Sequence, residues 1–115
     1  MPPKRNPLNL NPLQLKTLTL LQALTRIDGH IVRKDEDGTL IVGGIPAPHG
    51  DHFHLGDAVV ASRDATGLAN PAAWTALERK GLIKSFFPQG AAITPAGQAY
   101  DTGLADVILH RHAGH

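Results

Sequence analysis

Apolar residues at helical spacing predict a helix near the start of the chain. Four of them recur with a period close to 3.6 residues, namely Leu13, Leu20, Leu24 and Ile27. Asn11 and Pro12 are a typical helix start, because Asn caps free N–H groups and Pro fits the first turn. The opposite side of this helix has the polar residues Thr17, Gln22 and Arg26. Gly29 then ends the helix.

Two short apolar runs around an acidic turn predict a β-hairpin over residues 30–45. Residues 31–32 lie on one side of the turn and residues 40–42 on the other. Between them stands Asp37-Gly38, a pair that favours a tight turn because glycine adopts positive φ without strain.

The middle of the chain predicts two helices in succession. Residues 48–56 have the composition of a loop or a short strand, and residues 57–64 predict a short helix that contains the β-branched pair Val59-Val60. After a glycine-containing turn, Asn70-Pro71 starts a second helix by the same capping logic, and Gly81 ends it. The apolar stripe of this second helix consists of Ala73, Trp74 and Leu77.

The last third of the chain predicts a tight hairpin and a closing helix. Residues 85–93 form the hairpin around Pro88-Gln89-Gly90. Thr94-Pro95 caps the helix, and Gly97 and Gly103 inside it each weaken it by about 1 kcal/mol relative to alanine. Its apolar face consists of Ala96, Tyr100, Leu104, Val107 and Ile108.

Two motifs in this half of the chain resemble those of a known superfamily. Residues 77–83 (Leu-Glu-Arg-Lys-Gly-Leu-Ile) are similar to the end of the recognition helix in bacterial winged-helix regulators of the multiple-antibiotic-resistance type. Residues 93–99 (Ile-Thr-Pro-Ala-Gly-Gln-Ala) are similar to the start of the last helix in those regulators. The resemblance covers residues 57–100. It implies an α+β winged helix-turn-helix, here with an added N-terminal helix, a preceding β-hairpin and a C-terminal helix.

The resemblance also implies a function, that of a DNA-binding transcriptional regulator. Residues 70–80 would be the recognition helix in the major groove of duplex DNA. The residues implied in base contacts are Asn70, Thr75 and Arg79, and those implied in phosphate contacts are Lys80, Lys84 and Arg63. The aliphatic faces of the first and last helices would suit a homodimer.

The charge of this segment leaves a second function open. Residues 57–94 contain four basic and three acidic residues, a net charge of +1, whereas phosphate neutralisation supplies much of DNA affinity. Pro71, Ala72 and Ala76 form a small, flat surface that suits packing by another protein chain. The alternative is therefore a winged-helix protein–protein interaction module that binds no DNA.

A cluster of histidines suggests a third possibility, a metal site. The cluster consists of His49, Asp51, His52 and His54. Imidazoles are common metal ligands, and in an extended segment His52 and His54 share one face, so zinc or another divalent metal is a candidate ligand. The competing interpretation is a set of polar loop and strand residues. Three further histidines at the C-terminus, His110, His112 and His115, form a tail that binds metal at most adventitiously.

Composition limits the remaining classes. At 115 residues and 42% apolar content the chain suits one domain over residues 12–112, with a flexible arm at 1–11 and a frayed end at 113–115. The absence of cysteine excludes disulfides and thiolate chemistry and fits a cytoplasmic setting. No run of about 20 apolar residues predicts a membrane span, and no signal peptide is expected.

No enzyme is predicted. The serines, Ser62 and Ser85, lack the context of a nucleophile elbow. Gly43-Gly44 lacks the Lys-Ser or Lys-Thr that completes a phosphate-binding loop.

Overall fold

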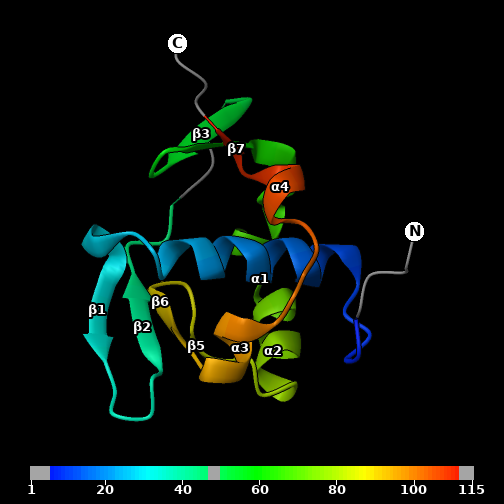
Figure 1. Cartoon of the computed structure of the whole chain (residues 1–115). Coiled ribbons are helices and arrows are strands. Elements are labelled where there is room, and N and C mark those ends of the chain that lie inside the picture. The colour runs from blue at the N-terminus through cyan, green and yellow to red at the C-terminus, as the bar shows by residue number, and fades with distance from the viewer. Residues whose placement is uncertain (1–5, 47–49, 112–115) are drawn as a thin grey trace.

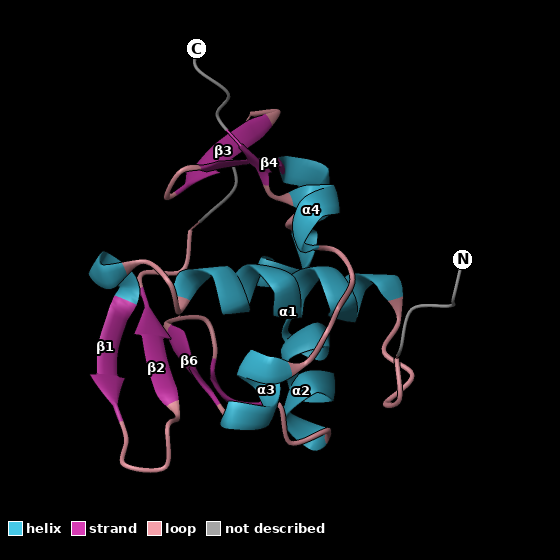
Figure 2. Ribbon diagram, viewed as in Figure 1, coloured by secondary structure: helices cyan, strands magenta, loops and turns pink. Residues whose placement is uncertain are grey.

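The computed structural model describes residues 6–46 and 50–111, which form an α+β domain (Figures 1 and 2). The α-helices of this part are α1 (Pro12–Leu24), α2 (Pro71–Arg79), α3 (Pro95–Ala99) and α4 (Ala105–Ile108). The strands are β1 (Ile31–Lys34), β2 (Leu40–Gly43), β3 (His52–Leu55), β4 (Ala58–Ala61), β5 (Ile83–Phe86), β6 (Gly90–Ile93) and β7 (His110–Arg111). Three short 3-10 helices are η1 (Asp28–His30), η2 (Ser62–Asp64) and η3 (Thr66–Ala69).

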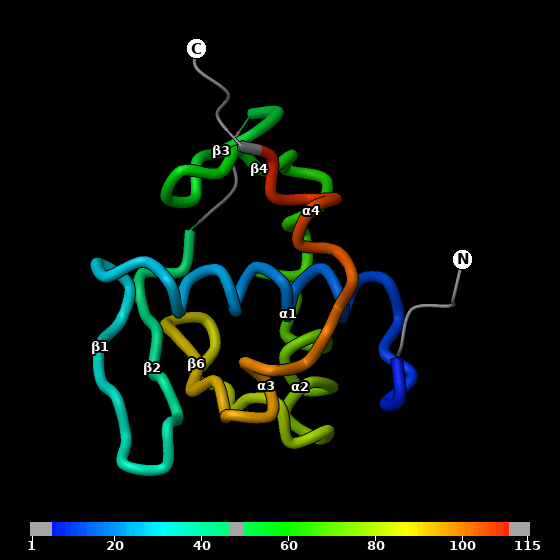
Figure 3. Tube along the Cα trace, viewed as in Figure 1, coloured from blue at the N-terminus to red at the C-terminus, as the bar shows by residue number. Residues whose placement is uncertain are grey.

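Helix α1 crosses the middle of the molecule and separates two groups of elements (Figure 1). The four-stranded sheet, α2 and α3 lie on one side of it, while β3, β4, β7 and α4 lie on the other (Figure 3 follows the chain between them). The predicted start of α1 at Asn11-Pro12 is confirmed. The side chain of Asn11 accepts from the Gln14 N–H at 2.8 Å, and the Gln14 side chain accepts from the Asn11 N–H at 3.0 Å. This reciprocal capping box fixes the first turn.

The polar side predicted for α1 is largely buried, because α1 is covered from more than one direction. Thr17, Thr19 and Gln22 are all less than 9% exposed. The Gln22 amide donates to the carbonyls of Gly97 at 2.8 Å and Tyr100 at 2.7 Å. Gln22 therefore attaches α1 to the chain around α3, rather than facing water.

The larger sheet has the strand order β1-β2-β6-β5, and every neighbouring pair is antiparallel. Both predicted hairpins are confirmed, as β1–β2 and β5–β6. Strand β2 also pairs with β6, with Leu40 opposite Ile93 and Gly43 opposite Gly90. At this point the strands approach so closely that a Cβ on Gly90 would overlap the Val42 carbonyl. The two hairpins thus form a single sheet.

The predicted helix over residues 57–64 is wrong. Residues 58–61 are strand β4, which pairs with β3 and with β7 in the order β3-β4-β7, and only η2 follows it. Val59 and Val60 explain the difference, since β-branched side chains are stiff in helices and pack well on a sheet. The loop-or-strand prediction for residues 48–56 is resolved as strand β3 over its second half.

The predicted closing helix is also wrong as one continuous element. It is divided into α3 and α4, and residues 100–104 between them are extended or turned. Gly103 adopts φ +70°, which does not continue a helix. The Thr94 cap is confirmed, since its hydroxyl accepts from the Gly97 N–H at 3.0 Å.

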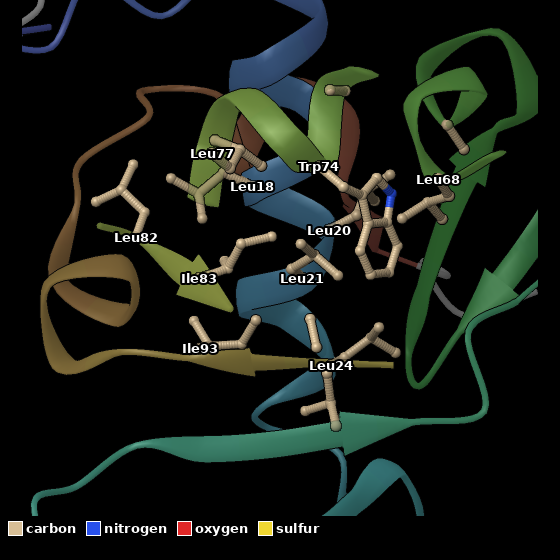
Figure 4. Close-up of a cluster of buried hydrophobic side chains, with 14 of the residues drawn as sticks. Leu18, Leu20, Leu21, Leu24, Leu68, Trp74, Leu77, Leu82, Ile83 and Ile93 are labelled. Carbon is tan, nitrogen blue, oxygen red and sulfur yellow. The ribbon is translucent and has the colours of Figure 1, made fainter. Parts of the chain in front are cut away.

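One core of buried apolar residues joins α1, α2 and α4 to strands of both sheets, and Figure 4 shows part of it. Leu18 and Leu21 of α1 lie against Trp74 and Leu77 of α2 and against Ile83 of β5. The same cluster continues into the second sheet through Phe53, Leu55 and Val60, and into α4 through Ile108. The smaller sheet is thereby packed onto the domain rather than forming a separate unit.

Candidate nucleic-acid interface

Helix α2 has one buried face and one exposed face. Ala73, Trp74 and Leu77 are 3% exposed or less, as the apolar stripe predicts. Trp74 is a core residue, whose indole N–H donates to the Gly67 carbonyl at 3.1 Å and whose ring meets Phe87 edge-on with centroids 5.2 Å apart. The opposite side consists of Pro71, Ala72, Thr75, Glu78 and Arg79, all exposed. Its first turn therefore offers small apolar groups, and its last turn offers charge.

The basic side chains gather where α2 leads into β5. Arg79 ends the helix, Lys80 is its C-cap, and Lys84 is the second residue of β5. All three are exposed, and no carboxylate of the described residues lies within ion-pair distance of them. Glu78 is turned toward the hairpin, since its carboxylate accepts from the Ser85 N–H at 3.4 Å. Three positive charges against one negative charge leave +2 at this junction.

The β5–β6 hairpin is short and its turn packs back onto the domain. Phe87 is half-buried against Trp74, and its N–H donates to the Ser85 hydroxyl at 3.2 Å. Pro88 and Gln89 at the tip are exposed. Along the outer side of β5 the ammonium of Lys84 lies 6.0 Å from the centre of the Phe86 ring, and Phe86 is 44% exposed. The sequence analysis did not identify Phe86 as a surface residue beside these cations. The available signal was that Lys84 and Phe86 are two residues apart on a strand, so their side chains lie on the same face.

The structure does not bring all the predicted DNA contacts together. Asn70 lies at the other end of α2, about 13 Å along the helix from Arg79 at 1.5 Å per residue. Its side-chain oxygen caps the helix by accepting from the Ala72 N–H at 3.0 Å. Arg63 belongs to η2, which follows β4 on the other side of α1. There the neighbouring Asp64 forms an ion pair with Lys16 at 2.9 Å. Thr75 and Arg79 lie one helical turn apart on the exposed side of α2, and the exposed Lys80 and Lys84 follow where the chain leads into β5.

Two of the predicted metal ligands, His52 and His54, lie on strand β3 of the second sheet, which is on the opposite side of α1 from α2 (Figure 1). His49 lies outside the described residues. His52 and His54 are exposed on one face of β3, with ring centroids 5.9 Å apart, while Phe53 between them is buried. Asp51 precedes the strand, and among the described residues no three His, Asp or Glu side chains converge as a metal cluster. The four-residue metal site remains a prediction.

A groove that the sequence did not indicate runs between the end of α1, the β3–β4 turn and α4. Its volume is about 570 Å³, and its apolar wall includes Ile27, Leu55 and Leu109. Its charged lining consists of Arg26, Asp57 and Asp106.

Comparison of the chain with protein-family models, with curated proteins and with solved structures found no match. The resemblance in residues 57–100 therefore remains a prediction. None of the helices in the described ranges is long and apolar enough to cross a bilayer.

Proposed function

We propose that this chain is a winged-helix protein that binds duplex DNA, with α2 as its recognition helix and the β5–β6 hairpin as its wing. The observation that carries the proposal is that the β5–β6 hairpin follows α2 directly and pairs with the earlier strand β2 in the order β2-β6-β5. After α1 the chain forms β1 to β4, then the 3-10 helices η2 and η3, helix α2 and the β5–β6 hairpin, and β2 closes the sheet on that hairpin. We interpret this order as a winged helix-turn-helix in which β3 and β4 are inserted between the closing strand and the helical turns.

The first member of the helix pair is reduced in this chain. In place of an α-helix, the 3-10 helices η2 and η3 precede α2. Helix η3 contacts α2 through the hydrogen bond from Trp74 to Gly67, and it contacts α1 where Gly67 lies against Thr17. A Cβ at Gly67 would overlap the Thr17 hydroxyl, so glycine permits this close contact. The support for α2 is thus preserved without a full helix before it.

The chemistry of the exposed surface favours phosphate contact over extensive base reading. Arg79 and Thr75 are its candidates for base contact, because Arg reads guanine edges and Thr bonds either kind of base. Lys80 and Lys84 suit phosphates, and the Phe86 ring beside Lys84 adds an apolar contact for the sugar backbone. The first turn of α2 has no long polar side chain, since Pro71 and Ala72 are there. The proposal leaves Arg63 outside the interface and assigns Asn70 to helix capping.

The experiment is a fluorescence-anisotropy titration with random-sequence duplex DNA at 50 and 200 mM salt. Two phosphate contacts, from Lys80 and Lys84, give a slope of about −1.8 in log affinity against log salt. Affinity should therefore fall about 12-fold over that range. Arg79→Ala should weaken binding by about 1–3 kcal/mol.

Arg33→Ala is the matched control. It removes the same charge from an exposed position on β1, the strand at the opposite edge of the sheet from β5, and we expect it to leave affinity unchanged. Equal losses for Arg33→Ala and Arg79→Ala would reject α2 as the binding element. Absence of binding at 50 mM salt would reject DNA as the ligand and favour the protein-interaction module.

A further inference from the structure

The edge strands of the two sheets differ in how they are protected against pairing with another chain. Strand β1 has an irregular register between Ile31 and Arg33 and exposes Arg33 and Lys34, and β5 exposes Lys84. Bulges and lysines of this kind normally prevent edge-to-edge association. Strand β3 is the outer strand of the order β3-β4-β7, yet it pairs with β4 in regular register and contains no Lys, Arg or Pro.

The ionisable side chains of β3 are two histidines in a His-Xaa-His arrangement. His52 and His54 stand on one face because side chains alternate along a strand, and both are exposed. The other face, with Phe53 5% and Leu55 4% exposed, is fixed in the core, so the imidazole pair has a defined direction. The rings lie 5.9 Å apart with their planes at 72°. Rotation about the soft second side-chain torsion of histidine brings two such rings onto one ion at about 2.0–2.1 Å from each nitrogen.

Two imidazoles are half of a tetrahedral zinc ligand set. We propose that two copies of this chain pair antiparallel along their β3 edges, with Phe53 opposite Phe53, and that His52 and His54 of both copies bind one Zn²⁺. A two-fold axis through this register sets His52 of one copy opposite His54 of the other, as an isologous interface requires. This inference is independent of DNA binding.

The dimensions of a sheet allow the four rings to converge. Residues opposite each other on antiparallel strands have Cβ atoms about 4.5–5.5 Å apart, and residues two apart on a strand lie about 7 Å apart. The four histidines then stand at the corners of a rectangle of about 5 by 7 Å. An ion above its centre is within reach of each imidazole. No third ligand within one copy is needed, consistent with the lack of a three-residue metal cluster in the described part of one chain.

His110 supplies a matched control on the same face of the same sheet. Val59 pairs with His54 on one side and with His110 on the other, so the two histidines stand in one row, but His110 is on the strand at the opposite edge. Two strand spacings, about 9.5 Å, separate them, and the proposed pairing moves the ion further from His110. His110→Ala should therefore leave zinc binding unchanged.

The experiment measures the mass of the untagged full chain by light scattering on a sizing column, with EDTA and with 0.5 equivalents of Zn²⁺. In EDTA the chain should elute at its monomer mass of 12.2 kDa, and with Zn²⁺ at twice that value. Isothermal titration should give one Zn²⁺ per two chains, and Co²⁺ in place of Zn²⁺ should give the intense visible absorption of a tetrahedral site. His52→Ala and His54→Ala should each abolish the zinc-dependent dimer, and His110→Ala should retain it.

A second control separates the site from the other histidines. A variant with His49, His112 and His115 all replaced by Ala should still dimerise with Zn²⁺. Three results would each overturn the proposal: a monomer in the presence of Zn²⁺, a dimer that persists in EDTA, or a zinc-dependent dimer that survives His52→Ala but is lost in the triple variant. Far-UV circular dichroism of each variant shows whether it is folded, and a folded His52→Ala monomer keeps the test decisive.

Discussion

Replacing Gly97 by alanine tests whether the contact between α3 and Leu82, the residue before β5, is as tight as the structure has it. Helix propensity alone predicts that Gly97→Ala stabilises α3 by about 1 kcal/mol. In the structure an added Cβ would overlap the carbonyl oxygen of Leu82 and lie 2.9 Å from its carbonyl carbon. Both atoms belong to the backbone, so the clash is relieved only by moving one element away from the other.

The cost of that movement follows from the bonds at this point. The Leu82 carbonyl accepts from the Thr94 N–H at 3.1 Å and from the Thr94 hydroxyl at 3.0 Å, and Gln22 donates to the Gly97 carbonyl at 2.8 Å. Overpacking costs about 1–3 kcal/mol, and loss of one or two hydrogen bonds adds about 1 kcal/mol each. After the gain in helix propensity is subtracted, the expected loss in the free energy of unfolding is about 1–4 kcal/mol.

Urea denaturation followed by tryptophan fluorescence measures this loss. Trp74 is the only tryptophan and is fully buried, so its emission reports unfolding of the core. Gly29→Ala is the control, because a Cβ there meets no heavy atom within 4 Å, and its free energy of unfolding should change by less than about 1 kcal/mol. If Gly97→Ala unfolds at the same urea midpoint as the wild type, or at a higher one, a tight contact between Gly97 and Leu82 is refuted.

Two further predictions concern single contacts. Trp74→Phe should lower the free energy of unfolding by about 2 kcal/mol, because the Gly67 carbonyl keeps the Asn70 N–H but loses the indole donor, and a void replaces part of the indole. Urea denaturation followed by circular dichroism measures this loss, and an unchanged midpoint would contradict it. Hydrogen bonds from the Thr39 N–H and hydroxyl lower the pKa of the Asp37 carboxyl below its ordinary value. This contribution to stability is therefore present at neutral pH and lost as the pH falls through the lowered pKa. NMR titration should find that Thr39→Ala raises the pKa of Asp37 part of the way back, and an identical pKa in both proteins would contradict this origin.

Much of the fold is local and could be predicted from the sequence. Asn11-Pro12, Asn70-Pro71 and Thr94-Pro95 mark helix starts because capping depends on the residue and its next few neighbours. The two hairpins follow from apolar runs on either side of turn residues, and the burial of Trp74 follows from helical spacing. These features need no knowledge of what packs against them.

Where the predictions failed, contacts distant in sequence decided the outcome. The segment 58–61 is short and apolar and is compatible with either a helix or a strand. Its pairing with β3 and β7 makes it a strand. The apolar periodicity predicted one continuous closing helix. In the structure the Gln22 amide donates to the carbonyls of Gly97 and Tyr100, and α3 ends there. Gly97 likewise changes from a weak helix residue to a necessary one because Leu82 lies against it.

The candidate sites divide in the same way. The sequence determined which residues have suitable chemistry: the cations near the end of α2 and the histidines of residues 49–54. Only the tertiary structure decided which of them share a surface. Arg79, Lys80 and Lys84 are exposed where α2 leads into β5, whereas Arg63 lies in η2 on the other side of α1. Strand β3 is an edge strand on which His52 and His54 are exposed. The physical reason is that residue type is set locally, whereas the neighbours of a residue depend on how strands pair and how the core is filled.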